Sequence, residues 1–67
     1  MSEQVVKELA ALWKYHARAA DELGKTGKWD RSAYHATIAN GLNQQSQNIP
    51  ALRQAIAGAN TAPPAGA

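Results

Sequence analysis

The stretch from Val5 to Leu23 (VVKELAALWKYHARAADEL) decides the fold of this chain. Apolar and small side chains recur along it at intervals of three and four residues, the period of one helix face. They form two adjacent lines, which are Val5, Leu9, Leu12, His16, Ala19 and Leu23, and Val6, Leu9, Trp13, His16, Ala20 and Leu23. The stretch therefore predicts an amphipathic helix of about six turns.

The residues on either side of this stretch suit the two ends of a helix. Ser2 can accept a hydrogen bond as N-cap, and Glu3 places an acid in the first turn. Gly24 follows the last apolar residue and suits the left-handed position just beyond a helix. We therefore expect the first helix over residues 3–23.

A second helix is predicted after the short basic connection KTGKW, residues 25–29. Asp30 is a suitable N-cap, and Ser32 is the alternative. The spacing of three and four residues continues through Arg31, His35, Ile38, Leu42, Gln45 and Ile49. A helix over residues 31–48, joined to the first by so short a loop, predicts an antiparallel helical hairpin.

Pro50 interrupts this second pattern. It has no N–H to donate and disfavours helical geometry for Ile49, whereas Leu52 and Ile56 keep the apolar line in phase. Either the second helix kinks and continues, or a short third helix over residues 50–57 begins at Pro50. We expect an all-α domain over residues 1–59, followed by a disordered Pro/Ala tail over residues 60–67 (NTAPPAGA).

The length of 67 residues allows one small domain with a marginal core. The chain has no cysteine, so no disulfide can reinforce that core. Association with further copies is the natural way to bury more apolar surface, and we expect a homo-oligomer. The residues expected at its interface are Leu9, Trp13, Leu42, Gln45, Ile49, Leu52 and Ile56.

The charge of the chain is mildly positive, with seven basic and five acidic residues and a net charge of +2. A dedicated nucleic-acid-binding domain usually has a larger excess. No apolar run approaches the roughly 18 residues that a membrane-spanning helix needs. The polar start MSEQ is unlike a signal peptide, so we expect a cytoplasmic protein without membrane association.

A repeated segment contains both histidines and both tyrosines of the chain. Tyr15-His16-Ala17 in the first helix recurs as Tyr34-His35-Ala36 in the second, so the repeat predicts related helix faces. With the turn near residues 27 and 28, the two histidines would be offset along the helix axis by about one helical turn, roughly 5–6 Å. They are either ordinary histidines at the edge of the core or part of a binding pocket at a subunit interface.

A basic cluster around the loop offers a second candidate site. Lys25, Lys28 and Arg31 can hold a phosphate, and Trp29 can stack on a base. Tyr15, His16, Tyr34 and His35 complete the candidate ligand-binding set. The alternative is an ordinary solvated face, which continues along the first helix and is partly neutralised by Asp21 beside Lys25 and by Glu3 beside Lys7.

No arrangement typical of catalysis is visible in the sequence. General acid–base chemistry needs a titratable group beside a second partner, and the residues four positions after His16 and His35 are both alanines. No carboxylate joins the histidines to complete a metal-ligand set. We expect neither an enzyme nor a bound metal or cofactor.

The second helix carries a neutral, amide-rich surface made of Asn40, Asn43, Gln44, Gln45, Gln47 and Asn48. Such a surface can hydrogen-bond to a protein partner without a large cost of charge desolvation. It is equally compatible with an ordinary hydrated surface.

The pattern of Trp13, Ala17 and Leu23, followed by Ala33-Tyr34-His35 with Ala39 and Leu42, resembles short alanine-rich helical proteins of bacteriophages. The resemblance covers roughly residues 9–56. It implies an accessory or anti-defence inhibitor that binds a host protein in the host cytoplasm. Some proteins of this kind are oligomers that sequester cyclic nucleotides. Alternatives are therefore a sponge for a small anionic ligand or, by analogy of fold, a helical hairpin dimer that binds RNA or DNA.

Overall fold

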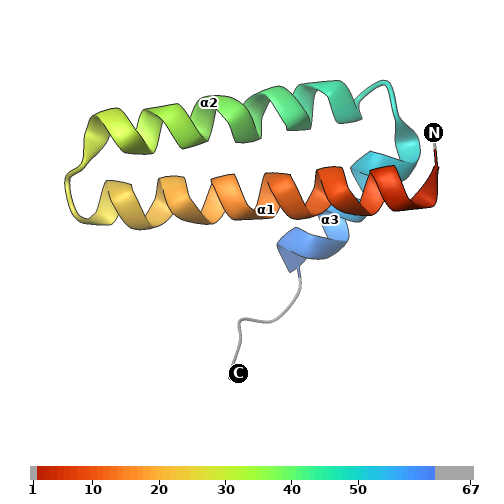
Figure 1. Cartoon of the computed structure of the whole chain (residues 1–67), viewed down its shortest axis with the longest axis horizontal. Helices are drawn as coiled ribbons and strands as arrows, with labels where there is room; N and C mark the ends of the chain where they lie inside the picture. Colours follow the sequence, from red (N-terminus) through yellow and green to blue (C-terminus); the bar gives the residue numbers. More distant parts are fainter. Residues whose placement is uncertain (1, 62–67) are drawn as a thin grey trace.

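The computed structural model describes residues 2–61 of the chain, which form three helices: α1 (Glu3–Lys25), α2 (Trp29–Ser46) and α3 (Pro50–Thr61). The prediction of an all-α fold is confirmed. Helix α2 runs back alongside α1, and α3 then turns back towards α1 (Figure 1). Within the described residues, no helix is long and apolar enough to span a bilayer.

Helix α1 begins as the sequence predicts. The Ser2 hydroxyl accepts a hydrogen bond from the backbone N–H of Val5 at 3.2 Å, which satisfies one of the unpaired N–H groups of the first turn. Glu3 supplies the negative charge that a helix N-terminus favours.

The C-terminal end of α1 differs from the prediction. The helix continues through Gly24 to Lys25, and Gly27, with φ of +77°, occupies the left-handed position. The N–H of Lys28 donates to the carbonyl of Leu23 at 2.9 Å, and the N–H of Gly27 donates to that of Gly24 at 3.1 Å. These two bonds form a Schellman motif. Gly24 was therefore the wrong choice, because a helix tolerates glycine and the reversal needs it three residues later.

Helix α2 starts two residues before the predicted position, and neither predicted N-cap acts as one. Lys28 is the N-cap residue and makes no side-chain capping bond. Asp30 instead lies in the first turn. The Ser32 hydroxyl donates to the backbone carbonyl of Ala20 on α1 at 2.7 Å, so this side chain fixes α2 against α1.

Pro50 is the first residue of a separate third helix. Helix α2 ends at Ser46. The N–H groups of Gln47, Asn48 and Ile49 then each donate to a carbonyl three residues earlier. Proline needs no partner for its nitrogen at the first helical position, so α3 can start there. Of the two alternatives left open, the structure has the short third helix.

Helix α3 continues to Thr61, past the predicted end at residue 57. Asn60 and Thr61, which were assigned to the tail, therefore belong to this helix. The rest of the predicted tail, residues 62–67, lies outside the described residues.

The core lies where α3 meets the N-terminal half of α1. We call Val6, Ala10, Leu52 and Ile56 the core cluster, because all four are buried and in mutual contact. Leu52 is 1% exposed and is among the most completely buried side chains described. Four partly buried residues pack around the cluster, namely Leu9, Trp13, Ile49 and Ala55.

Candidate functional site

The two histidines of the repeated segment meet between α1 and α2. Nδ1 of His16 lies 2.8 Å from Nδ1 of His35, and their ring centroids are 5.0 Å apart. The sequence had predicted an offset of about one helical turn between them along the helix axis. The Ser32–Ala20 hydrogen bond explains the difference, because it centres the reversal near residue 26 and brings His35 almost opposite His16.

This contact assigns different roles to the two rings. A hydrogen bond between two Nδ1 atoms needs one nitrogen to carry the proton and the other to accept it. In a pair of neutral rings, one ring is the Nδ1–H tautomer and the other is the Nε2–H tautomer, so that one Nε2 is an acceptor and the other a donor.

Both tyrosines pack against the histidine pair edge-on. The centroid of Tyr15 lies 5.0 Å from that of His16 and 6.1 Å from that of His35, and the centroid of Tyr34 lies 5.1 Å from that of His35. The interplanar angles of 78–80° are those of the favourable edge-to-face arrangement. We call these four residues the Tyr-His cluster.

The Tyr-His cluster is a surface feature rather than an enclosed pocket. Tyr15 is 64% exposed and Tyr34 is 63% exposed, whereas the two histidines are half-buried. Over residues 2–61 there is no group of three or more His, Cys, Asp or Glu side chains that could hold a metal ion. The arrangement offers aromatic area and a few hydrogen-bonding groups, which suits recognition of another molecule.

The basic residues of the predicted ligand site lie around the loop. Lys28, Trp29 and Arg31 line a shallow hollow together with Gly27 and Asp30. Trp29 is 70% exposed. The carboxylate of Asp30 shares this hollow with the two cations, which weakens its attraction for an anion.

Lys25, the remaining basic candidate, is occupied by acids of its own helix. Its Nζ lies 3.1 Å from a carboxylate oxygen of Asp21 and 3.7 Å from one of Glu22. The hydrogen bond with Asp21, together with the two negative charges, raises the pKa of Lys25 above its usual value. The predicted ligand-binding set is thus divided between the loop hollow and the Tyr-His cluster, and Lys25 belongs to neither.

Most residues expected at an oligomer interface pack in or against the core of the single chain. Leu52 and Ile56 are in the core cluster, and Leu9, Trp13 and Ile49 pack against it. Leu42 on α2 is half-buried, and Gln45 is exposed. Little of this set is therefore free to contact another molecule.

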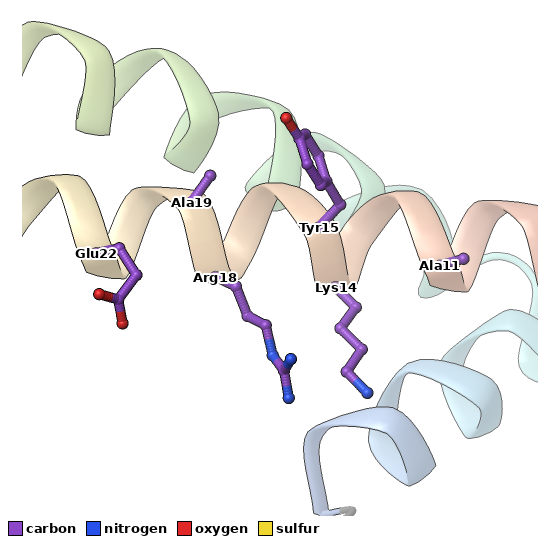
Figure 2. Close-up of a pocket in the computed structure, with 6 residues that line it drawn as sticks. All are labelled: Ala11, Lys14, Tyr15, Arg18, Ala19 and Glu22. Carbon is purple, nitrogen blue, oxygen red and sulfur yellow. The ribbon is translucent and has the colours of Figure 1, made fainter. Parts of the chain in front are cut away.

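A further surface escaped the sequence analysis. A shallow groove runs along the outside of α1, and all the residues that line it belong to that helix (Figure 2). Its lining residues are Ala11, Lys14, Tyr15, Arg18, Ala19 and Glu22. The signal that marks this groove is alternate spacing of three and four residues on the polar side of α1, which is masked by the stronger apolar pattern on the other side.

No protein-family model, curated protein or solved structure matches this chain. Its function has to be inferred from its own residues.

Proposed function

We propose that this chain is a non-enzymatic binding protein that recognises a protein partner through the exposed side of α1 and α2 around the Tyr-His cluster. The observation that carries the proposal is the placement of its exposed large apolar side chains. Leu12 and Tyr15 are 44% and 64% exposed on α1, and Tyr34 is 63% exposed on α2. Tyrosine is enriched at the centres of protein interfaces, where it often contributes most of the binding energy.

The spacing of these residues supports one continuous surface. Val5, Leu12 and Tyr15 are separated by seven and three residues, so they share one side of α1. Tyr15 and Tyr34 both make edge contacts with His35. The face therefore combines aliphatic and aromatic area with hydroxyl and imidazole groups, as interface centres do.

The alternative of a sponge for a small anionic ligand has weaker support. The groove on α1 is walled by a single helix and therefore cannot enclose a small molecule as ligand pockets do. The loop hollow contains Asp30 beside its cations. Nothing in the loop geometry distinguishes a nucleotide from any other anion.

The resemblance to phage inhibitors leads to a narrower form of the proposal, in which the partner is a component of a host defence system. The open aromatic face supports a protein partner whether or not that partner belongs to a host defence system.

The experiment compares the tagged wild-type chain with two double variants as baits in lysate of the producing or host cell. Tyr15→Ala with Tyr34→Ala removes the aromatic face, and Lys28→Ala with Arg31→Ala removes the loop cations. We expect one protein to be retained by the wild type and the loop variant, and binding of that purified protein to weaken by about tenfold to a hundredfold in the tyrosine variant.

A partner whose affinity is unchanged by the tyrosine variant would contradict the proposal. Calorimetry against a nucleotide panel provides the comparison with the sponge. Heat of binding that disappears in the loop variant would favour the anionic ligand instead.

A further inference from the structure

Six exposed residues form a line along the outside of α1, and we call this line the outer stripe. Its members are Gln4, Glu8, Ala11, Tyr15, Arg18 and Glu22. They alternate at intervals of four and three residues, which is the spacing of a seam between two helices packed nearly parallel or antiparallel. Ala10 and His16, which face α3 and α2, lie on other sides of the helix.

The shape of the outer stripe suits close approach of another helix. Figure 2 shows Tyr15 on one side of the groove, with Lys14 and Arg18 extending on the other. Ala11 and Ala19 contribute only methyl groups, so the middle of the groove is low. A ridge of side chains from a second helix can enter such a groove.

Two charges on the outer stripe lack ion-pair partners within the described residues. Five other charged residues of α1 do pair, since Lys7 contacts Glu3 and Lys25 contacts both Asp21 and Glu22. The Glu8 carboxylate accepts a hydrogen bond from the side-chain amide of Gln4, with 3.2 Å between Nε2 and Oε1. Arg18 takes part in no ion pair of residues 2–61, although Glu22 lies one turn away.

The stripe is complementary to itself when it is read in the opposite direction. If α1 of a second copy runs antiparallel, Ala11 faces Tyr15 of the second copy and Glu8 faces its Arg18. A two-fold axis repeats both contacts, so the pair gains two ion pairs and inserts two tyrosine rings over alanines. Gln4 then faces Glu22 and can donate its amide to that carboxylate.

Neighbouring registers are less favourable. In one, Tyr15 lies on the two-fold axis, and Glu8 faces Glu22 of the second copy, which is repulsive. In another, Glu8 faces Lys25 of the second copy, but Lys25 is already held by Asp21 and Glu22. Charge complementarity therefore selects the register that pairs Glu8 with Arg18.

We propose that a second copy of this chain occupies the outer stripe, with the two α1 helices antiparallel in this register. The inference goes beyond the proposed function, since it names a second copy of the chain as the occupant of the side of α1 that carries Tyr15. Because the seam is mostly polar and the contact is small, the dimer is weak and reversible. Tyr34 and the amide-rich surface of α2 stay outside the seam, so a dimer exposes two copies of this α2 surface.

Sedimentation equilibrium of the full chain tests the proposal through a charge exchange. Glu8→Arg alone, or Arg18→Glu alone, places like charges together twice in each dimer. Either change should raise the dimer dissociation constant about tenfold. Combining both changes restores opposite charges and should return the constant close to that of the wild type. In the register that uses Lys25, the double variant would instead stay weak.

Lys28→Glu, which changes a charge outside the stripe, is the matched control and should leave the dimer unchanged. Circular dichroism establishes that each variant is folded. A wild type that is monomeric up to millimolar concentration, single variants that dimerise normally, or a double variant without recovery would each overturn the proposal.

The outcome also separates this pairing from the proposed function. A monomeric wild type that still binds a protein partner through Tyr15 and Tyr34 would overturn self-pairing and leave the proposed function standing. If the wild type dimerises, the double variant recovers dimerisation, and the wild type retains no other protein from lysate, self-pairing is supported and the proposed function is contradicted.

Discussion

The core cluster and the Tyr-His cluster are both built where α1 meets another helix, but they differ in what holds them. In the core cluster, aliphatic side chains from α1 and α3 are buried with Leu52 at the centre. In the Tyr-His cluster, two half-buried imidazoles share one hydrogen bond beneath exposed tyrosines. The first arrangement stabilises the fold by removing apolar area from water, and the second joins α1 to α2 through one hydrogen bond and leaves an open surface.

The largest expected effect is at the core cluster. Leu52→Ala removes a side chain that is 1% exposed and leaves a cavity between α1 and α3. We expect a loss of about 2–5 kcal/mol in the free energy of unfolding, measured by urea titration, which is enough to unfold so small a domain. Arg53→Ala, at the exposed neighbouring position, is the control. Equal effects of the two changes would contradict a core centred on Leu52.

The next effect is at the reversal that leads into α2. Gly27 has φ of +77°, and a Cβ atom there would meet nothing within 4 Å, so Gly27→Ala tests backbone conformation alone. We expect a loss of about 1–2 kcal/mol in thermal or urea unfolding. Gly41→Ala, in the interior of α2 with free space around it, should stabilise by about 0.5–1 kcal/mol. A Gly27→Ala variant as stable as the wild type, or more stable, would show that the reversal does not depend on Gly27.

A smaller effect is expected from the hydrogen bond that sets the register of α2. Ser32→Ala removes the donor to the Ala20 carbonyl and should cost about 1 kcal/mol of unfolding free energy. The matched control is Thr37→Ala, because the Thr37 hydroxyl donates to Ala33 within its own helix at an exposed site. The control should change stability by only a few tenths of a kcal/mol. A larger loss at Thr37 than at Ser32 would contradict this account of the register.

The smallest effect concerns the histidine contact of the Tyr-His cluster. Nδ1 of His16 lies 2.8 Å from Nδ1 of His35, and both side chains are half-buried. The variant with His16→Gln and His35→Gln lacks this contact and should lose about 0.5–1 kcal/mol of unfolding free energy in urea titrations at constant pH. An unchanged unfolding free energy would mean that the histidine contact does not contribute.

The sequence predicts the helices far better than the way they meet. The apolar lines of α1, the Ser2 cap and the possibility of a helix starting at Pro50 are local patterns, and each agrees with the structure. The reversal offers two glycines, and only the hydrogen bonds of the folded chain distinguish Gly27 from Gly24. Because the register of α2 depends on which glycine makes the reversal, the direct contact of His16 with His35 could not be predicted from the sequence alone.

The candidate site could be predicted only in part from the sequence, for the same reason. The repeated Tyr-His segment identified the four residues of the aromatic cluster but not their contacts. The outer stripe is not evident from the sequence because its spacing is carried by polar and small residues such as Glu8, Ala11 and Arg18, whereas large apolar residues mark the core-facing side of α1. Of the residues expected at an interface, Leu52 and Ile56 lie in the core cluster, since α3 packs on α1. Leu9, Trp13 and Ile49 pack against that cluster, whereas Leu42 is half-buried and Gln45 is exposed.

The most direct test of the central claim is a dilution series of the isotope-labelled wild-type chain, followed by amide chemical shifts from millimolar to micromolar concentration. If α1 presents its outer stripe to a second copy, the shifts that change with concentration will be those of Ala11, Tyr15 and Arg18, and those of Leu52 and Ile56 will stay constant. Shifts that do not change with concentration, or changes that follow the core cluster instead, would contradict the claim.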